Sequence, residues 1–439
     1  MARGVAATRI AAALPLAAAV AVEATLLTCF QLVGDARPGL GVALLVAAFL
    51  PYLAAYRWTT GATRLTAVVL PLTLLLYLIP LFHGPTLDDD LWRYRWEGKV
   101  VATGHNPYRH TADDPALAPL RDAGWERVAF RHVTTVYPPA AELLFALGYR
   151  LGDGSLLPFR LLAIAGHGIC LCLLVGLLRG AGRPGRGALL YGWNPLIVKE
   201  VADSGHVDPW MVACLLGALL LAQRRHLRTA ATALGVAISV KWVPLLTLPL
   251  WRRRLGWRPL LLAPLIAAAL LLPFAGAGGR LFAGLTTYAD YWVFNPGVYW
   301  GLRGLLDPHL DLATAKLAAK AMCAAAWLTI YWRVARRQGD GLIDLTAALF
   351  AVIGALLLLV PTLDPWYLTW VLPLAPLVAG RLPTACWWYL SAGSCLSYLY
   401  YIDRADVPWG RWLEYVGFAV IWVWEQRRLT ARRREESGP

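Results

Sequence analysis

Residues 87–108 read LDDDLWRYRWEGKVVATGHNPY and combine three consecutive aspartates with two arginines, a lysine, a glutamate and a histidine. They directly follow an apolar stretch that ends near Phe82, in a chain with only 15% charged residues. Adjacent carboxylates repel one another unless cations or a metal ion lie close by. Arg95 supplies one such cation, and Asp89 and Arg93 are four residues apart, so their side chains can meet on one helix face. The stretch predicts a polar site at a membrane surface.

A carboxylate held in this way suits general-base chemistry, because it can accept a proton from a sugar hydroxyl. The aromatic residues around it fit either a sugar-stacking cleft or an interfacial belt; they are Trp92, Tyr94, Trp96 and Tyr108. The alternative is a solvated acidic turn that only ends a transmembrane helix.

The composition excludes an ordinary soluble protein. Of 439 residues, 58% are hydrophobic, and the mean hydropathy is +0.53. We therefore expect an all-α, polytopic membrane protein. The net charge of +14 comes mainly from arginines in short connections between apolar segments, which indicates charges held on one side of a bilayer and no nucleic-acid partner. The seven cysteines lie in apolar runs and show no disulfide or zinc spacing.

Apolar segments predict about twelve full spans plus one broken pair, twelve to fourteen membrane helices in a single integral domain, 1–439. The full spans are 10–33, 40–56, 65–82, 156–178, 187–202, 207–222, 259–275, 313–334, 342–361, 366–380, 384–402 and 410–426. The broken pair is 229–251, with Lys241 near its turn, because basic residues flank it on both sides. Non-helical backbone at that depth lines protein or a watery cavity.

The basic connections set the orientation, since arginine-rich loops stay cytoplasmic. We expect both termini and a basic tail, 427–439, in the cytoplasm of a multi-pass cell-membrane protein. The loops 83–155 and 276–312 are then extracytoplasmic. The residues used for this assignment are Arg3, Arg9, Arg57 and Arg64.

The first external loop contains an apolar segment, 139–151, that carries Glu142 and Arg150. If this segment crossed the membrane, the arginines at 179–186 would lie outside. An amphipathic helix in the outer interface preserves the charge rule and is the expected structure.

Further candidates lie at the outer ends of other spans. His206 and Asp208 flank one turn, as a catalytic or metal-binding pair or as a helix cap. Tyr137 precedes two prolines and has either a site role or only a stiff-loop role. Trp366 is expected to be an interfacial anchor.

Lys241 and Arg303 are cations with apolar flanks. An anionic phosphate that enters from the bilayer needs such a cation near the interface. The alternative is a side chain that extends to water or pairs with a helix-end carboxylate. For Lys241 we favour the phosphate-binding interpretation, because it interrupts a helix.

These residues together resemble the polyprenyl-phosphate-sugar-dependent integral-membrane glycosyltransferases of the GT-C fold. Within them, the chain is similar to bacterial polyprenol-phosphomannose-dependent mannosyltransferases and to glycosyltransferase family 87. The resemblance spans most of 85–370. The motifs are DDLWRYRWEG at 89–98, GHNPY at 104–108, TVYPP at 135–139, WNPL at 193–196, GHVD at 205–208, VKW at 240–242, FNPGVY at 294–299 and PWYL at 365–368.

The resemblance implies transfer of a sugar, with mannose expected, from a polyprenyl-phosphate carrier to an extracytoplasmic glycan or glycolipid, with inversion. Carried over by position, the general base is Asp89 or Asp90; the assignment of the lipid phosphate to Lys241 and Arg303 rests on their apolar flanks, as above. The first aspartate stands where the family has a small hydroxyl residue, so the division of labour among the three carboxylates stays open. Substrate binding is assigned to Asp88, Arg93, Tyr94, Glu97, Asn106, Tyr108, Tyr137, His206, Asp208, Asn295 and Tyr299.

No phosphate-cradling glycine loop appears, so no nucleotide cofactor is expected. A divalent cation (magnesium, manganese or calcium) at Asp89, Asp90 and Asp208 is one way to balance the carboxylates; the arginines alone are the other. The rival function is a transporter or flippase of lipid-linked sugars, because charged residues such as Lys199 and Glu200 lie near spans. A non-catalytic scaffold is a third alternative.

Overall fold

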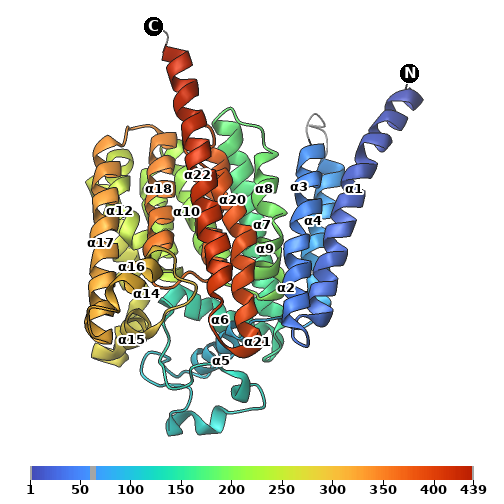
Figure 1. The fold of residues 1–439 in the computed structure, drawn as a ribbon. Coiled ribbons are helices and arrows are strands. Elements are labelled where there is room, and N and C mark those ends of the chain that lie inside the picture. Colours follow the sequence, from blue (N-terminus) through green and yellow to red (C-terminus); the bar gives the residue numbers. More distant parts are fainter. Residues whose placement is uncertain (1, 60–65, 438–439) are drawn as a thin grey trace.

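The computed structural model describes residues 2–59 and 66–437. Within these ranges the chain is helical, and its β-pairing consists of two isolated bridges, Phe294 with Thr362 and Ala379 with Leu382. The all-α prediction is therefore confirmed. Figure 1 shows a bundle of mostly upright helices with a smaller loop-rich layer at one end. Long apolar runs form helices in such a protein because a helix satisfies its own backbone polar groups.

Among the described residues, five segments are long and apolar enough to cross a bilayer, which confirms a polytopic membrane protein. They are Leu14–Val33, Pro38–Trp58, Leu157–Gly180, Trp257–Tyr291 and Leu342–Leu359. The pair Pro195–Asp203 and Asp208–Gln223, which is bent by 116° between its halves, is a broken span or a re-entrant loop and brings the number to six if it counts as one span. The predicted spans 313–334 and 410–426 lie within the long helices Leu312–Arg337 and Pro408–Ser437, whereas other apolar stretches are divided into shorter helices. The number of twelve to fourteen spans therefore stays a prediction.

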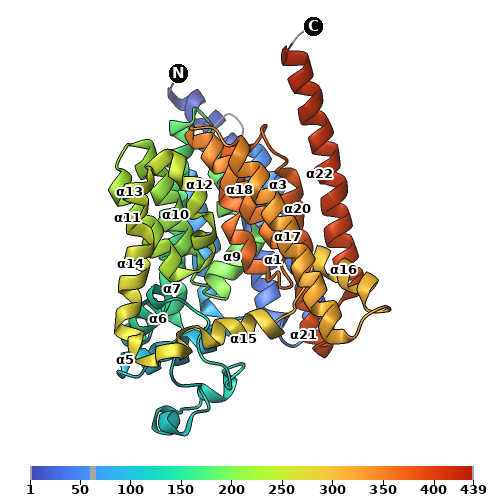
Figure 2. The ribbon, with the colours of Figure 1, turned by 90° about the vertical axis from the view of Figure 1, so that its left-hand side faces the viewer.

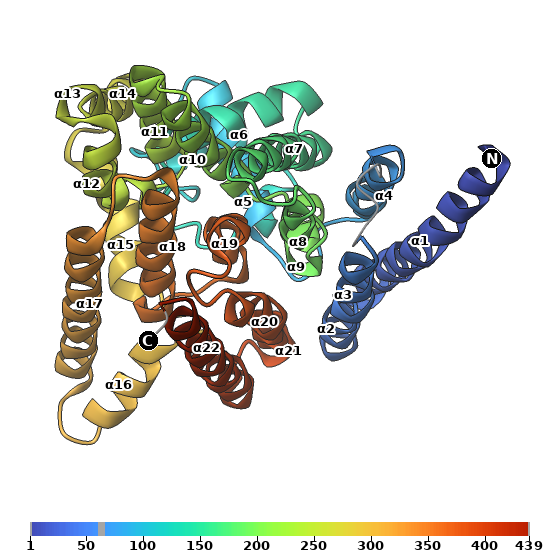
Figure 3. The same ribbon diagram turned by 90° about the horizontal axis from the view of Figure 1, so that it is seen from above.

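The N-terminal helices stand to one side of the other helices (Figure 3). They are α1 (Ala2–Val33), α2 (Pro38–Ala47), α3 (Phe49–Trp58) and α4 (Thr66–Leu78), followed by the 3-10 turn η1 (Ile79–Phe82). Arg64, used above for orientation, lies outside the described residues.

The central helices form the main body. They are α7 (Leu157–Gly180), α8 (Gly187–Gly192), α9 (Pro195–Val198), the π-helical turn η4 (Lys199–Asp203), α10 (Asp208–Gln223), α11 (Leu227–Val240), α12 (Val243–Leu255), α13 (Trp257–Leu260) and α14 (Leu262–Leu271). α10 packs against α7 and α11. The expected continuous span 187–202 is divided, because Asn194 caps a new helix that begins with Pro195.

The C-terminal part completes the bundle. It contains η5 (Leu272–Phe282), α15 (Ala283–Tyr291), α16 (Val298–Leu306), α17 (Leu312–Arg337), α18 (Leu342–Leu359), η6 (Pro365–Trp370), η7 (Leu372–Leu374), α19 (Ala375–Val378), α20 (Ala385–Gly393), η8 (Ser394–Leu399), α21 (Tyr400–Asp403) and α22 (Pro408–Ser437). α22 continues through the predicted basic tail, so the described part of that tail is helical. Figure 2 shows α15 running across the end of the bundle.

The predicted first external loop forms a layer at one end of the bundle. The N-terminal end of α1 and the C-terminal end of α22 lie at the opposite end (Figure 1). The loop contains α5 (Asp90–Ala102), η2 (Pro115–Leu120), η3 (Trp125–Arg127) and α6 (Pro139–Gly152). α6 matches the predicted helix 139–151. A Cβ on Gly98 would lie 2.2 Å from the carbonyl oxygen of Phe145, so glycine permits the close contact of α5 with α6.

The break predicted at Lys241 is confirmed. α11 ends at Val240, Lys241 is extended (φ −146°, ψ 144°), and α12 begins at Val243 with a proline in its first turn. Proline starts a helix readily because its missing N–H would be unpaired there. The break brings Lys241 to the same end of the bundle as α5, where it lies beside Asp208.

Candidate functional site

The three consecutive aspartates lie where α5 begins, and the structure gives each a different environment. Asp89 is the residue before the helix, and Asp90 is its first residue. Asp88 is buried, with 8% of its surface exposed, whereas Asp89 and Asp90 are partly exposed. Their neighbours come from distant parts of the chain: the turn at 203–208, the α11–α12 break, η6 and α21.

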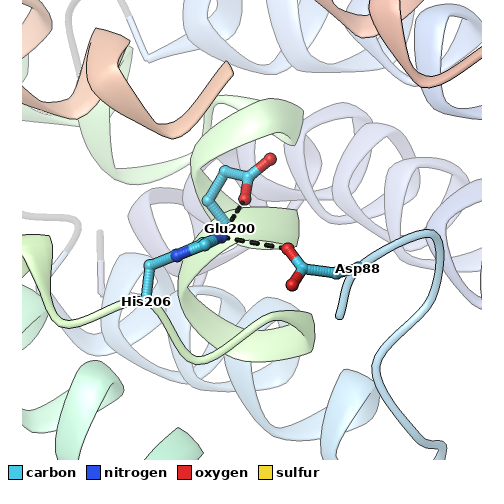
Figure 4. A group of neighbouring side chains, drawn as sticks. All are labelled: Asp88, Glu200 and His206. Atoms are coloured by element: carbon cyan, nitrogen blue, oxygen red, sulfur yellow. Dashed lines mark hydrogen bonds and ion pairs between the residues drawn. The ribbon is translucent and has the colours of Figure 1, made fainter. Parts of the chain in front are cut away.

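Asp88 belongs to a buried ionic network (Figure 4). Its Oδ2 lies 3.0 Å from His206 Nε2 and 3.6 Å from Lys199 Nζ. The backbone N–H of Asp90 donates to its other oxygen at 2.8 Å. Burial alone would raise the pKa of Asp88, but His206, Lys199 and the N–H of Asp90 together lower it, so the carboxylate is ionised.

Glu200 completes this network at the same ring nitrogen of His206. His206 Nε2 lies 3.0 Å from Glu200 Oε2, and Lys199 Nζ lies 3.7 Å from Glu200 Oε1. The Tyr398 hydroxyl donates to the same carboxylate. The His206 ring stacks on Trp366 with centroids 4.2 Å apart, so Trp366 contacts the site instead of being only the interfacial anchor predicted.

The local backbone explains how these side chains converge. η4 places Lys199 and Glu200 in a buried π-helical turn. Gly205 has φ +68°, and a Cβ there would lie 3.0 Å from Leu91 and 3.1 Å from Arg160. Glycine adopts this left-handed conformation readily, so the chain can turn sharply and direct His206 back toward α5.

A nitrogen and two carboxylate oxygens of Asp88, Glu200 and His206 lie within 4.8 Å of one another, so they could hold a metal ion. Lys199 changes the charge balance of this group. With a protonated imidazole, two cations face two carboxylates and the cluster is neutral. With a neutral imidazole and a divalent ion, the cluster would carry one excess positive charge. Because buried charge must be balanced, the donor set fits a protonated histidine better than a metal.

The structure does not bring together the predicted metal set. Asp208 is buried and accepts a hydrogen bond from Trp370 Nε1 at 2.6 Å, with Lys241 Nζ 3.4 Å away. Asp89 instead pairs with Arg404 at 3.6 Å. The described residues thus place a different group of ligands, Asp88, Glu200 and His206, at metal-binding spacing.

Asp90 occupies the middle position between the buried network and the exposed surface. The Tyr137 hydroxyl lies 3.4 Å from Asp90 Oδ2 and 3.1 Å from the Tyr94 hydroxyl. The Tyr94 hydroxyl in turn lies 2.9 Å from His206 Nδ1. Burial, and then the charge of Asp88, raise the pKa of Asp90 to about 6. It is therefore ionised at neutral pH and a stronger base than an ordinary aspartate.

The predicted helical pair of Asp89 with Arg93 is wrong, because Asp89 precedes the helix. Arg93 instead binds Glu97 at 2.9 Å. It also donates to the carbonyl groups of Ala129, Phe130, Val133 and Thr134. Arg93 and Glu97 thus hold the external loop onto α5.

Asn106 and Tyr108 also position backbone. The Asn106 amide donates to the carbonyl of Phe274 at 2.9 Å, and the Tyr108 hydroxyl donates to the carbonyl of Tyr137 at 2.8 Å. The second bond fixes the segment that carries Tyr137. Their predicted substrate contacts stay predictions, and their visible contacts are to the protein.

Lys241 lies at the site, with Nζ 4.9 Å from the ring centroid of Tyr137. Three other predicted residues have partners elsewhere. Asn295 donates to Glu414 of α22 at 2.8 Å, and Tyr299 is buried against α17. Arg303 forms an ion pair at 2.8 Å with Asp307, the residue that directly follows the end of α16.

Sequence reasoning missed several neighbours of the aspartates. The consecutive charges of Lys199 and Glu200 in an apolar run indicated the outer end of a helix pair and motivated the rival transporter function, but they were assigned no role at the site. Asp364 precedes η6, and burial, and then the charge of Asp90, raise the pKa of Asp364 to about 8. Tyr398 and Arg404 carry no local signal of a role at this site.

The chain is similar to known mannosyltransferases. A family profile described as Alpha-(1->6)-mannopyranosyltransferase, N-terminal domain, matches residues 2–253. Alpha-(1->6)-mannopyranosyltransferase A of Mycobacterium tuberculosis is 25% identical over 355 residues, 73% of this chain and 67% of the relative. The Corynebacterium glutamicum protein of the same name is 24% identical over 186 residues, 40% of this chain and 37% of the relative.

Proposed function

The chain belongs to the alpha-(1->6)-mannopyranosyltransferase family and is a membrane mannosyltransferase, and we propose that it moves mannose from a polyprenyl-phosphate carrier to a mannoside acceptor. We propose further that the reaction takes place at the extracytoplasmic end of the bundle, next to Asp90. The arginine distribution supports this orientation. The membership in a transferase family sets the transporter alternative aside.

The observation that carries the proposal is the position of Asp90. Asp90 is a partly exposed residue. Its carboxylate lies beside the Tyr137 hydroxyl, and its pKa is raised to about 6 by burial and by Asp88. Asp88 is committed to the buried network and Asp89 to Arg404. The pKa of Asp89 is also raised, but its carboxylate is paired with Arg404. Asp90 combines a raised pKa with a position beside Tyr137 and no such ion pair among the described residues, so we choose it as the base.

In the proposed reaction, Asp90 takes the proton of an acceptor hydroxyl. The oxygen of that hydroxyl forms a bond to the anomeric carbon of the donor as the bond from that carbon to the phosphate oxygen breaks. The electron pair of the broken bond leaves with the polyprenyl phosphate, a stable anion. Attack from the face opposite the phosphate inverts the anomeric centre, and no covalent sugar intermediate is needed.

Lys241 is the proposed partner of the leaving phosphate. It lies at the break between two apolar helices, and its ammonium group has Asp208 at 3.4 Å and the Tyr137 ring at 4.9 Å. It is also close enough to lower the pKa of Asp90. A cation fixed beside the base can stabilise charge that develops on the departing phosphate. Arg303 of α16, which is paired with Asp307, is not part of this proposal.

The test is transfer of radiolabelled mannose from polyprenyl-phosphate mannose to octyl α-mannoside by the purified full chain in detergent. Asp90→Asn should lower kcat on the order of 10²-fold or more, because a general base contributes that much. The matched control is Asp340→Asn, which removes an exposed carboxylate 4.0 Å from Arg253. It should leave kcat unchanged.

NMR of the product gives an independent check. An inverted anomeric configuration relative to the donor is expected, and retention would contradict direct displacement. If Asp90→Asn keeps wild-type kcat, Asp90 is not the base. If the wild-type chain transfers no mannose from this donor, the proposed donor is wrong.

A further inference from the structure

Asp89 differs from its two neighbours in where its carboxylate lies. Asp88 and Asp89 precede α5 and Asp90 is its first residue, and each of the three carboxylates has different neighbours. The side chain of Asp89 is 44% exposed and lies 3.6 Å from Arg404, whose side chain is 58% exposed. This ion pair connects the start of α5 to the turn between α21 and α22.

Two arginines that rest on aromatic rings flank Asp89. The Arg404 guanidinium lies 4.5 Å from the ring centroid of Tyr401. The Arg127 guanidinium lies 4.2 Å from the ring centroid of Trp92, one helical turn after Asp89. Both arginines lie close enough to Asp89 to lower its pKa, although burial, the larger effect, raises it. Charged and aromatic side chains thus form a half-exposed rim beside the proposed base; the rim consists of Asp89, Arg404, Arg127, Tyr401 and Trp92.

Tyr401 connects this rim to the other aspartates. Its hydroxyl lies within electrostatic range of Asp88, Asp89, Lys199 and Asp90. Asp89 directly precedes Asp90, so a molecule that touches Asp89 and Tyr401 would lie within electrostatic range of the proposed base. The arrangement suits a substrate that must present one hydroxyl to the base and be held by its other groups.

The chemistry of the rim matches a sugar. A carboxylate accepts hydrogen bonds from hydroxyl groups, and a guanidinium donates to them from a rigid planar fork. Aromatic rings offer flat apolar surface against which the C–H face of a sugar ring can pack. The exposed ion pair is weak in water, so a glycan can replace its two partners without losing a strong interaction.

We infer that the rim is a subsite for the mannoside acceptor, formed by Asp89, Arg404 and Arg127 with the rings of Trp92 and Tyr401. In this subsite Asp89 binds the glycan instead of acting as the base. This inference rests on the proposed function of the neighbouring site. The three aspartates then have three tasks: Asp88 stabilises the fold, Asp89 binds the acceptor and Asp90 takes the proton.

The experiment measures the acceptor and donor dependence of mannose transfer separately, with octyl α-mannoside and labelled polyprenyl-phosphate mannose. Asp89→Asn and Arg404→Gln should each raise the acceptor KM about 10-fold or more, as expected for a lost charged hydrogen bond. Donor KM should be unchanged and kcat should stay within about 3-fold. The acceptor KM of the double variant should exceed that of the more impaired single variant by no more than about 3-fold, because Asp89 and Arg404 contact each other and their effects are coupled. Asp340→Asn is the exposed-carboxylate control.

The kinetic outcomes separate the alternatives. Loss of kcat in Asp89→Asn at an unchanged acceptor KM would make Asp89 the base and overturn the inference. A rise in donor KM would assign the rim to the lipid phosphate and overturn it as well.

Saturation-transfer NMR without donor distinguishes failure of the inference from failure of the proposed function. Wild type and Asp90→Asn should bind octyl α-mannoside, and Asp89→Asn should bind it about 10-fold more weakly. Such binding supports the acceptor subsite even if no mannose is transferred from this donor. Equal binding by wild type and Asp89→Asn would overturn the subsite even if transfer proceeds.

Discussion

The two sides of the aspartate cluster show how the same side chain serves different purposes in different surroundings. On the inner side, Asp88 shares a buried imidazole and ammonium group with Glu200. On the outer side, Asp89 meets one exposed arginine at 3.6 Å. Water screens the charges of the exposed Asp89–Arg404 pair, whereas each buried charge of the inner network is compensated only by the other charges of that network. We therefore expect the inner side to set stability and the outer side to set acceptor affinity.

Breaking the inner side should have the largest effect on the fold. Lys199→Met leaves two buried carboxylates with one cation and should cost ~3–5 kcal/mol, the range for removing one partner of a buried ion pair. The thermal unfolding midpoint of the purified protein in detergent measures this loss. Asp89→Asn is the matched outer variant and should cost ~1 kcal/mol or less.

A second variant keeps this prediction open to contradiction if Lys199→Met folds poorly. Lys199→Met combined with Glu200→Gln removes one charge of each sign and should recover part of the lost stability. Equal unfolding midpoints for Lys199→Met and Asp89→Asn would mean that the two sides do not differ as proposed.

The pH dependence of transfer sharpens the comparison at the residue between the two sides. Asp90 works as a base when ionised, and its pKa is raised to about 6. The rate should therefore rise with pH through about 6 and fall about tenfold per pH unit below it. Asp89→Asn, assayed at saturating acceptor, should keep this midpoint. A midpoint that moves with Asp89→Asn would assign the titration to the outer carboxylate.

The smallest effect is expected from metal removal. Lys199 and a protonated His206 already balance Asp88 and Glu200, so EDTA should leave the transfer rate unchanged. The labelled-mannose assay, with and without chelator, measures this directly. Loss of activity that manganese or magnesium restores would place a functional cation at the site and contradict the protonated-histidine interpretation.

Local signals predicted part of this arrangement. The acidic start of α5, the helix at 139–151 and the break at Lys241 each depend on neighbouring residues, and each is present. The Asp89–Arg93 pair failed because the helix begins one residue later than that pairing requires. Arg303 was chosen for its apolar flanks, but Asp307 lies four residues further on and binds it.

Contacts between distant residues explain what was missed. Asp88 and His206 are 118 residues apart, and Glu200 and Tyr398 are 198 apart. The ion pair of Asp89 with Arg404 joins segments even further apart in the sequence. Neither residue spacing nor hydropathy encodes such pairings. The consecutive charges at 199–200 indicated an unusual buried group, but not which residues would balance it.

The sequence by itself determined that this is a helical membrane protein with an acidic site near one end of its bundle, because hydropathy and charge spacing act locally. Only the tertiary structure decided which aspartate is buried, which is basic and which faces the surface. The reason is physical: residues that are adjacent in the sequence can lie in different electrostatic environments. That environment is supplied by Lys199, Glu200, His206 and Arg404, which folding brings from elsewhere in the chain.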